Sequence, residues 1–165
     1  GYASLKEKIE IKQVIEDSNQ SVHVDYPFYL LLSERESKDT NDSSLISYFT
    51  YDHLTYLFMG DASKQIEKQL MATYDLKADV IKVGHHGSNT SSDPDFLDSL
   101  DCKIALISCG YKNKYGHPSV ETLKTLENLH INTLCTSDCG SIAMYSLFHF
   151  SFVVTNDGMF GIIWT

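Results

Sequence analysis

Short apolar segments alternate with amphipathic segments through the middle of this 165-residue chain, and this order limits the fold more than any other feature. Residues 80–83 and 104–109 are predicted to be buried strands, because the second run is apolar except for Ser108. Residues 132–136 form a further predicted strand. Strands that are separated by helices favour a layered structure in which the helices pack on a sheet.

Helical periodicity begins after Gly60, where three apolar residues share one face of a predicted helix: Ile66, Leu70 and Tyr74. Glu67 and Lys68 are predicted to lie on the outer side of this helix. Either Asp61 or Ser63 is suited to cap its N-terminus, since both side chains accept hydrogen bonds from backbone N–H groups.

Prolines predict the starts of the next two helices, because proline is favoured at the first helical position. One start is at Asp93-Pro94, and the other is at Pro118. The second of these helices is predicted to place four apolar residues near one face: Val120, Leu123, Leu126 and Leu129.

Both ends of the chain are rich in predicted strands. Residues 5–24 suggest short strands, and residues 34–44 are polar enough to predict a surface loop. Residues 45–50 and 55–59 predict a hairpin that turns at Asp52 and His53. Residues 141–165 predict β-structure with a turn at Asn156-Asp157-Gly158. We therefore expect one domain over residues 1–165, of α+β or α/β class.

Charge and hydrophobicity exclude some functional classes. The net charge of −9 argues against a dedicated nucleic-acid-binding surface, although bound metal ions could still allow a nuclease. The acidic excess is also explained by solubility alone. No apolar stretch reaches about 18 residues and no signal peptide is visible, so we expect a soluble domain, with a cytoplasmic location slightly favoured.

The four cysteines contain no Cys-x-x-Cys pair, which makes a zinc ribbon a poor interpretation. Cys102 and Cys109 flank or lie within the predicted strand at 104–109, and buried thiols are the simplest reading. Cys135 and Cys139 straddle a turn and could form a disulfide only in an oxidising compartment.

Candidate functional residues follow three predicted strands, where the strand fixes a loop and leaves its side chains free. Asp61 could bridge two divalent metals, or it could be a helix cap. His85 and His86 lie in a glycine-flanked loop, so that one could bind a metal while its neighbour either supports the metal ligands or serves the substrate. His117, between Gly116 and Pro118, could hold a phosphate or a metal-bound water, or it could be a surface histidine.

The order of these segments resembles the second half of the metallo-β-lactamase fold, and most closely the C-terminal domain of ComEC-type competence proteins. The resemblance covers about residues 41–144. It is found in these segments: Asn41-Asp42-Ser43-Ser44-Leu45, Leu57-Phe58-Met59-Gly60-Asp61, residues 78–91 with their His-His-Gly-Ser, Ile107-Ser108-Cys109-Gly110, Asn113, Tyr115-Gly116-His117-Pro118, and Thr136-Ser137-Asp138-Cys139-Gly140.

The resemblance implies a four-layered αβ/βα sandwich, of which this chain would be mainly the C-terminal half, with a dinuclear zinc or manganese site. In that scheme Asp61 resembles the bridging carboxylate, and His86, or less readily His85, resembles the late histidine ligand. His85 and His117 would serve catalysis, with His117 contacting the scissile phosphate. A metal-bound hydroxide would attack a phosphodiester, and domains of this type are thought to process the non-transported strand of incoming DNA.

The chain departs from this family because the upstream HxHxDH metal motif occurs nowhere in it. Asp61 and one histidine cannot fill a zinc site that needs three protein ligands. We therefore expect absent or weak metal binding in a fragment, truncated product or degenerate copy. Half a sandwich would expose a sheet face, so we also expect a homodimer or pairing with a missing N-terminal half. A phosphorylcholine-esterase-like or other small-substrate hydrolase and a non-catalytic remnant are the alternatives.

Overall fold

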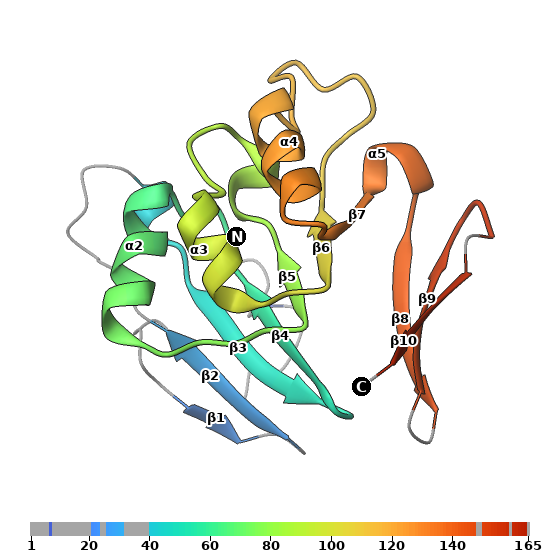
Figure 1. Ribbon diagram of the computed structural model, residues 1–165, viewed down its shortest axis with the longest axis horizontal. Helices are drawn as coiled ribbons and strands as arrows, with labels where there is room; N and C mark the ends of the chain where they lie inside the picture. The colour runs from blue at the N-terminus through green and yellow to red at the C-terminus, as the bar shows by residue number, and fades with distance from the viewer. Residues whose placement is uncertain are drawn as a thin grey trace.

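A seven-stranded sheet forms the centre of the computed structural model, which describes residue 7 and residues 21–23, 26–31, 40–147, 150–158 and 160–164 (Figure 1). Its strands follow one another in chain order from β1 to β7. The bounds are β1 Ser21–His23, β2 Pro27–Leu31, β3 Ile46–Tyr51, β4 Leu54–Phe58, β5 Val80–Lys82, β6 Ile104–Ile107 and β7 Asn132–Cys135. Strands β1 to β4 pair antiparallel, and β4 to β7 pair parallel.

Helices cover one face of this sheet, and a second sheet lies against the other face (Figure 1). The helices are α2 Lys64–Thr73, α3 Pro94–Leu100, α4 Val120–Asn128 and the short α5 Thr136–Cys139. The second sheet is antiparallel and consists of β8 Ile142–Leu147, β9 Phe150–Thr155 and β10 Phe160–Trp164. Short 3₁₀ turns occupy Asn41–Ser43 and Gly84–Gly87.

Two apolar cores hold these layers together. Between the helices and the large sheet, Leu70 and Phe96 pack among sheet residues that include Leu57. Between the two sheets, Val80 of β5 packs with Val153 of β9. Consecutive strand residues point to opposite faces, so β5 and β6 contribute side chains to both cores. The described chain is thus a mixed α/β structure, as the strand and helix alternation predicted.

Local sequence patterns correctly predicted the positions of most helices and strands. The hairpin at 45–59 is confirmed, and its turn places Asp52 and His53 in left-handed conformations. Ser63, one of the two predicted caps, accepts from Gln65 N at the start of α2. Asp93 likewise caps α3, with Pro94 as its first residue. The C-terminal turn before Gly158 is also confirmed.

Three sequence predictions about burial were wrong. Glu67 was expected on the outer side of its helix, but it is only 1% exposed because its carboxylate accepts from Ser92 N and Asp93 N. Asp42 lies in the region expected to be a surface loop, yet it is buried and accepts from Ser63 N.

The apolar face of α4 was also predicted too broadly. Leu126 is fully buried, whereas Val120 is 68% exposed and Leu123 is 40% exposed. The helix begins at Val120 rather than at Pro118, and Ser119 is its N-cap. Because α4 packs mainly against β7 at the edge of the sheet, only a narrow stripe of the helix is covered.

Some sequence predictions concern residues that the structure does not describe. The expected strands around Ile9 and Ile11 and most of the loop at 34–44 lie outside the described residues. In the described part of the chain, no helix combines the length and the hydrophobicity that crossing a membrane requires.

Candidate functional site

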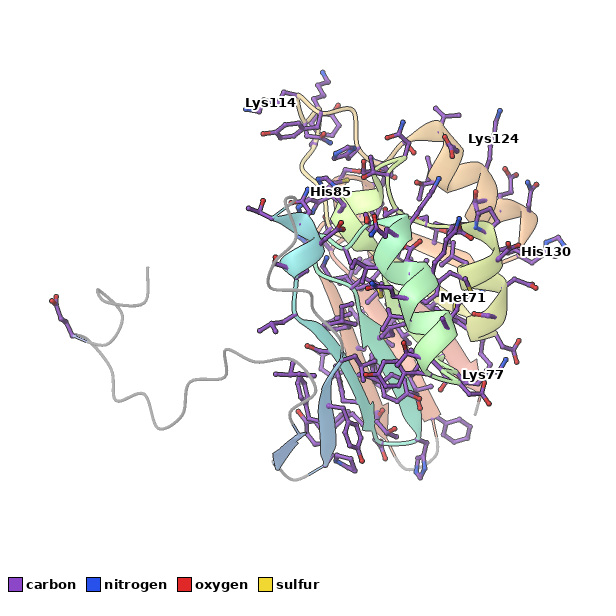
Figure 2. The ribbon with its side chains drawn as sticks, turned by 90° about the vertical axis from the view of Figure 1, so that its left-hand side faces the viewer. Met71, Lys77, His85, Lys114, Lys124 and His130 are labelled. Atoms are coloured by element: carbon purple, nitrogen blue, oxygen red, sulfur yellow. The ribbon has the colours of Figure 1, made fainter. Side chains whose placement is uncertain are left out.

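The candidate residues lie at one end of the large sheet because the strands that they follow are parallel to one another. Strands β4, β5 and β6 are neighbours, so their carboxyl ends meet at the same edge. Asp61 follows β4, His85 and His86 follow β5, and His117 lies on the long connection after β6. Figure 2 shows His85 at the same end of the molecule as Lys114, with Lys77 at the opposite end.

Asp61 and His86 form the closest pair of candidate ligands. The distance from His86 Nε2 to Asp61 Oδ1 is 3.6 Å, and both side chains remain partly exposed. His86 Nδ1 lies 2.6 Å from the carbonyl oxygen of Ser108. Because a carbonyl can only accept, Nδ1 must carry the hydrogen, and a neutral His86 then presents its Nε2 lone pair toward Asp61. Metal-binding histidines are commonly held in this way by their second nitrogen.

A second pair joins His85 to His117. Their ring centroids lie 5.6 Å apart, and those of His85 and His86 lie 6.4 Å apart. His85 Nδ1 is 3.2 Å from the hydroxyl oxygen of Thr90, which fixes the ring orientation. The three imidazoles therefore occupy one small region, although they come from two loops.

The loop that carries His85 and His86 has an unusual backbone. Both histidines adopt left-handed conformations, with φ of 45° and 55°, and Gly87 continues the turn with φ of 79°. Left-handed non-glycine residues cost about 1 kcal/mol or more each, so the surrounding contacts must hold this turn in place. Such strained positions concentrate at functional sites.

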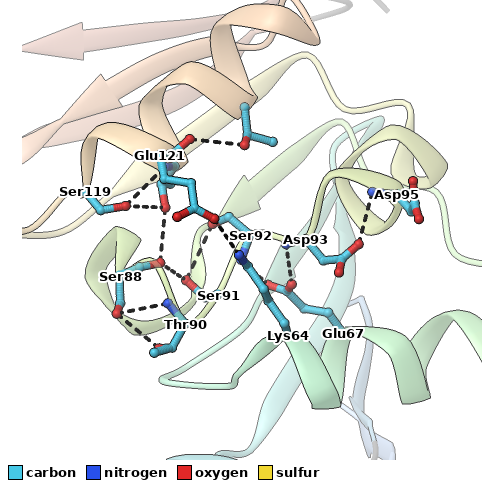
Figure 3. Close-up of polar contacts among 12 residues, drawn as sticks. Lys64, Glu67, Ser88, Thr90, Ser91, Ser92, Asp93, Asp95, Ser119 and Glu121 are labelled. Carbon is cyan, nitrogen blue, oxygen red and sulfur yellow. Dashed lines mark hydrogen bonds and ion pairs between the residues drawn. The ribbon is translucent and has the colours of Figure 1, made fainter.

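Hydrogen bonds to neighbouring segments supply that support (Figure 3). Ser88 Oγ accepts from the Thr90 hydroxyl, and the Ser88 carbonyl accepts from the Thr122 hydroxyl on α4. Ser119 N donates to the Gly87 carbonyl, which joins this loop to the segment after His117. A Cβ on Gly87 would meet the Pro118 side chain at 2.8 Å, so glycine allows the two loops to approach.

A cavity of about 300 Å³ opens beside His86 and His117. Its lining also includes Ser108, Cys109, Gly110, Asn113 and Tyr115. The Asn113 side chain accepts from His117 N and donates to the His117 carbonyl, which closes the loop around the histidine. The Tyr115 ring stacks on His117 with centroids 5.8 Å apart. The cavity is thus bounded by an imidazole on one side and by an ordered polar loop on the other.

Burial and neighbouring charges change two ionisation equilibria at this edge. Burial, followed by the nearby His85 and His86, lowers the pKa of His117 and favours its neutral form. Burial also lowers the pKa of Lys82, while the negative charge of Asp61 acts in the opposite direction. Lys82 lies on the same face of β5 as Val80, which packs toward the second sheet, and its ammonium group interacts with the candidate carboxylate.

Several residues at this edge were not singled out as functional from the sequence. Ser44 Oγ accepts from Asp61 N, and the Ser108 carbonyl holds His86. Asn113 and Tyr115 shape the cavity around His117. The only sequence signal for them was their place in the segments that carry the family resemblance. Asp61 itself does not cap α2, because Ser63 does.

The donor set is incomplete for a metal centre within the part of the chain that the structure describes. There, no three His, Cys, Asp or Glu side chains gather closely enough to hold an ion. Asp61 and His86 have suitable donor atoms and a suitable His86 tautomer, so they fit part of such a site. A zinc site commonly needs three protein ligands, and this pair alone falls short of that number.

No family model matches the chain, but its sequence is similar to parts of several competence and recombination proteins. ComE operon protein 3 of Bacillus subtilis (strain 168) is 36% identical over 120 residues, which is 72% of this chain and 16% of the relative. Competence protein ComA of Neisseria gonorrhoeae is 33% identical over 126 residues, which is 75% of this chain and 18% of the relative.

A third relative matches a shorter region. Recombination protein 2 of Haemophilus influenzae is 37% identical over 70 residues, which is 42% of this chain and 9% of the relative. The chain therefore spans less than a fifth of the length of these relatives. Taken together, these findings show that about three quarters of the chain is similar to a short segment of two competence proteins.

Proposed function

We propose that this chain is the metal-dependent hydrolase part of a DNA-uptake protein and that it has the architecture of the metallo-β-lactamase fold. The observation that carries the proposal is the meeting of Asp61 with His86 and of His85 with His117 at one sheet edge. The layered arrangement of helices, large sheet and second sheet is compatible with one part of that fold. Similarity to competence proteins supports DNA as the phosphodiester substrate.

Asp61 and His86 would hold a divalent cation such as Zn²⁺ or Mn²⁺ through a carboxylate oxygen and Nε2. A bound divalent cation supplies Lewis-acid activation of water and of a phosphoryl oxygen. Burial and the neighbouring histidines lower the pKa of His117 and so favour its neutral form, and a neutral imidazole can either donate to a phosphate oxygen or accept a proton. Thr90 orients His85 beside it. Two protein ligands are few, so we expect weak binding unless further ligands are supplied.

The loop before His117 carries groups that suit a single-stranded nucleic acid. Tyr111 is 75% exposed and Tyr115 is 70% exposed. Lys112 Nζ lies 5.2 Å from the Tyr111 ring centroid, and Lys114 Nζ lies 4.9 Å from that of Tyr115. Exposed rings next to cations are the usual contacts for bases and phosphates of an unpaired strand. The local positive charge here offsets the acidic surface for this one region.

Binding of a divalent cation by Asp61 and His86 is tested by the paramagnetic broadening of NMR signals, which detects even weak Mn²⁺ binding. As Mn²⁺ is added, the ring proton signals of His86, and next those of His85 and His117, should broaden before those of His130. His130 is an exposed histidine far from this loop (Figure 2), which makes it an internal control. Asp61→Asn should abolish the selective broadening, whereas Asp98→Asn, at an exposed position of α3, should not. Uniform broadening of all histidines would refute the assignment of the metal ligands.

The substrate is tested by hydrolysis of single-stranded DNA beside bis-p-nitrophenyl phosphate in excess Mn²⁺. Cleavage of DNA that Asp61→Asn abolishes supports the proposed nuclease. Cleavage of the small ester alone would favour a small-substrate hydrolase. If neither substrate is cleaved while selective broadening is also absent, the chain acts without catalysis and the proposal is wrong.

Strand binding is tested separately by fluorescence anisotropy with a labelled oligonucleotide. Loss of one stacked base costs about 1–3 kcal/mol, so Tyr115→Ala should weaken binding by a factor of about five or more. Tyr51→Ala is the matched control, because Tyr51 is also exposed but lies at the opposite end of the large sheet. Equal effects of the two substitutions would argue against base stacking on this loop.

A further inference from the structure

We propose that Cys109 and Cys135 form an intramolecular disulfide and that this pair is a redox modification site beside the cavity that Cys109 lines. Their Sγ atoms lie 3.1 Å apart, although the residues are 26 positions apart in the sequence. All four cysteines are free thiols in the structure. The pairing rests on geometry at the ends of β6 and β7 and is independent of any hydrolytic activity.

Strand pairing brings the two thiols together. Ile107, the last residue of β6, pairs with Cys135, the last residue of β7. Beyond this point the Thr136 hydroxyl accepts from Cys109 N and donates to the Cys109 carbonyl, both at 2.9 Å. These two hydrogen bonds hold the Cys109 backbone against the start of α5. A disulfide needs sulfurs about 2.05 Å apart, so closure requires an approach of about 1 Å.

The other possible pairings are less favourable. Cys139 is close to Cys135 in the sequence, but its Sγ donates to the Cys135 carbonyl oxygen at 3.0 Å instead of meeting the Cys135 sulfur. Cys102 lies before β6, at the end of the sheet opposite to Cys109. The Cys135 sulfur also contacts the Ser137 hydroxyl at 3.1 Å, a hydrogen bond that bridge formation would give up.

Exposure gives the two thiols different roles in the reaction. Cys109 is partly exposed and lines the cavity, whereas Cys135 is only 6% exposed. A small disulfide such as oxidised glutathione therefore reaches Cys109 first. The Cys109 thiolate attacks one sulfur of the reagent, breaks its S–S bond and releases one small thiolate.

Closure of the protein bridge follows by the same chemistry. The Cys135 thiolate attacks the Cys109 sulfur of the mixed disulfide and releases the second small thiolate. In sum, two protein thiols lose two protons and two electrons, and one small disulfide is reduced to two thiols. Burial raises the pKa of Cys135, so this second step should become faster as the pH rises.

The bridge lies next to groups of the candidate site. Ser108, whose carbonyl holds His86, directly precedes Cys109, and the loop to His117 begins directly after it. A bridge would therefore fix the start of this loop to the end of β7. Oxidation would also close residues 109–135 into a covalent loop, which restricts the unfolded chain and raises the resistance to denaturant.

Peptide mapping tests the proposal because specific proteolysis can place the four cysteines in separate peptides. Trypsin separates Cys102 from Cys109, and cleavage before Asp138 separates Cys135 from Cys139. Dilute protein is equilibrated with oxidised and reduced glutathione, alkylated, digested and analysed by mass spectrometry. We expect a linked pair of peptides that contain Cys109 and Cys135, together with a higher denaturant midpoint that a reductant reverses.

Single substitutions provide the controls. Cys139→Ser and Cys102→Ser should keep the linked peptides and the shift in midpoint, whereas Cys109→Ser should lose both. Mapping of the unsubstituted chain does not depend on whether any variant folds. The proposal is overturned if excess oxidised glutathione leaves Cys109 only as a mixed disulfide, links Cys135 to Cys139, or links separate chains.

Discussion

Glu67 should make the protein less stable as the pH rises through neutrality. Burial is the main cause that raises the pKa of this carboxyl from 4.5 to about 7, and Asp93 adds to the rise. The hydrogen bonds from Asp93 N and Ser92 N, at 2.7 and 2.8 Å, and the charge of Lys64 oppose it without cancelling it. The side chain is 1% exposed, so solvent screening is small.

The sign of the effect follows from proton binding. Between pH 4.5 and about 7 the folded chain keeps a proton on Glu67 that the unfolded chain has lost. The stabilisation is therefore complete below pH 4.5 and disappears as the pH rises past about 7. At about 1.4 kcal/mol for each tenfold change in proton affinity, the rise in pKa corresponds to about 3 kcal/mol.

Glu67→Gln isolates this contribution because glutamine does not titrate. Its amide nitrogen will face one of the two backbone donors, which adds a cost of about 1–3 kcal/mol that does not vary with pH. Denaturant unfolding of both proteins from pH 4.5 to 8 should show the original chain losing about 3 kcal/mol relative to the variant. Glu121→Gln, which removes a carboxylate on α4 that is 62% exposed, is the matched control.

Two results would refute this reasoning. Parallel pH profiles for the original chain and Glu67→Gln would show that the carboxyl has the same proton affinity in both states. A rise in the relative stability of the original chain with pH would show that the two N–H donors outweigh desolvation and depress the pKa instead.

Three further predictions concern packing and reactivity. Leu126→Ala should lower the free energy of unfolding by about 2–5 kcal/mol, and Leu123→Ala by less than about 1 kcal/mol, because only the Leu126 side chain is fully buried. Urea denaturation measures both values, and equal losses would contradict the observed buried face of α4. Gly87→Ala should lower the free energy of unfolding by about 1–3 kcal/mol, because position 87 has a positive φ and an added Cβ would meet Pro118. The substitution should also shift the ring signals of nearby histidines in NMR spectra. Unchanged spectra and stability would show that the loop does not need glycine. Burial raises the pKa of Cys102 to about 12, so iodoacetamide should label it far more slowly at pH 8 in the folded chain than in denaturant, and equal rates by mass spectrometry would refute its burial.

The expected dimer remains a prediction that light scattering can check. On the second sheet, Tyr145 and Phe150 are 53% and 47% exposed, which is consistent with an apolar face that another surface could cover. A clean monomer across a range of concentrations would contradict this expectation.

The sequence by itself determined most elements, because these depend on local chemistry. Ser63, Asp93 and Ser119 cap helices through their own side chains, and the apolar run that begins at residue 104 is typical of a covered strand, which the structure places at Ile104–Ile107. The same local patterns marked Asp61, His85, His86 and His117 as candidates, since polar residues in glycine-containing loops after strands are free to bind.

Only the tertiary structure decided which of these residues meet, since contact depends on strand order and direction. The parallel pairing of β4, β5 and β6 brings Asp61 to His86, and the pairing of β6 with β7 brings Cys109 to Cys135 rather than leaving Cys135 to its sequence neighbour Cys139. Glu67 is buried for the same reason, because the backbone donors that it satisfies belong to a segment 25 residues away. Helical periodicity describes one segment at a time and contains no information about such distant partners.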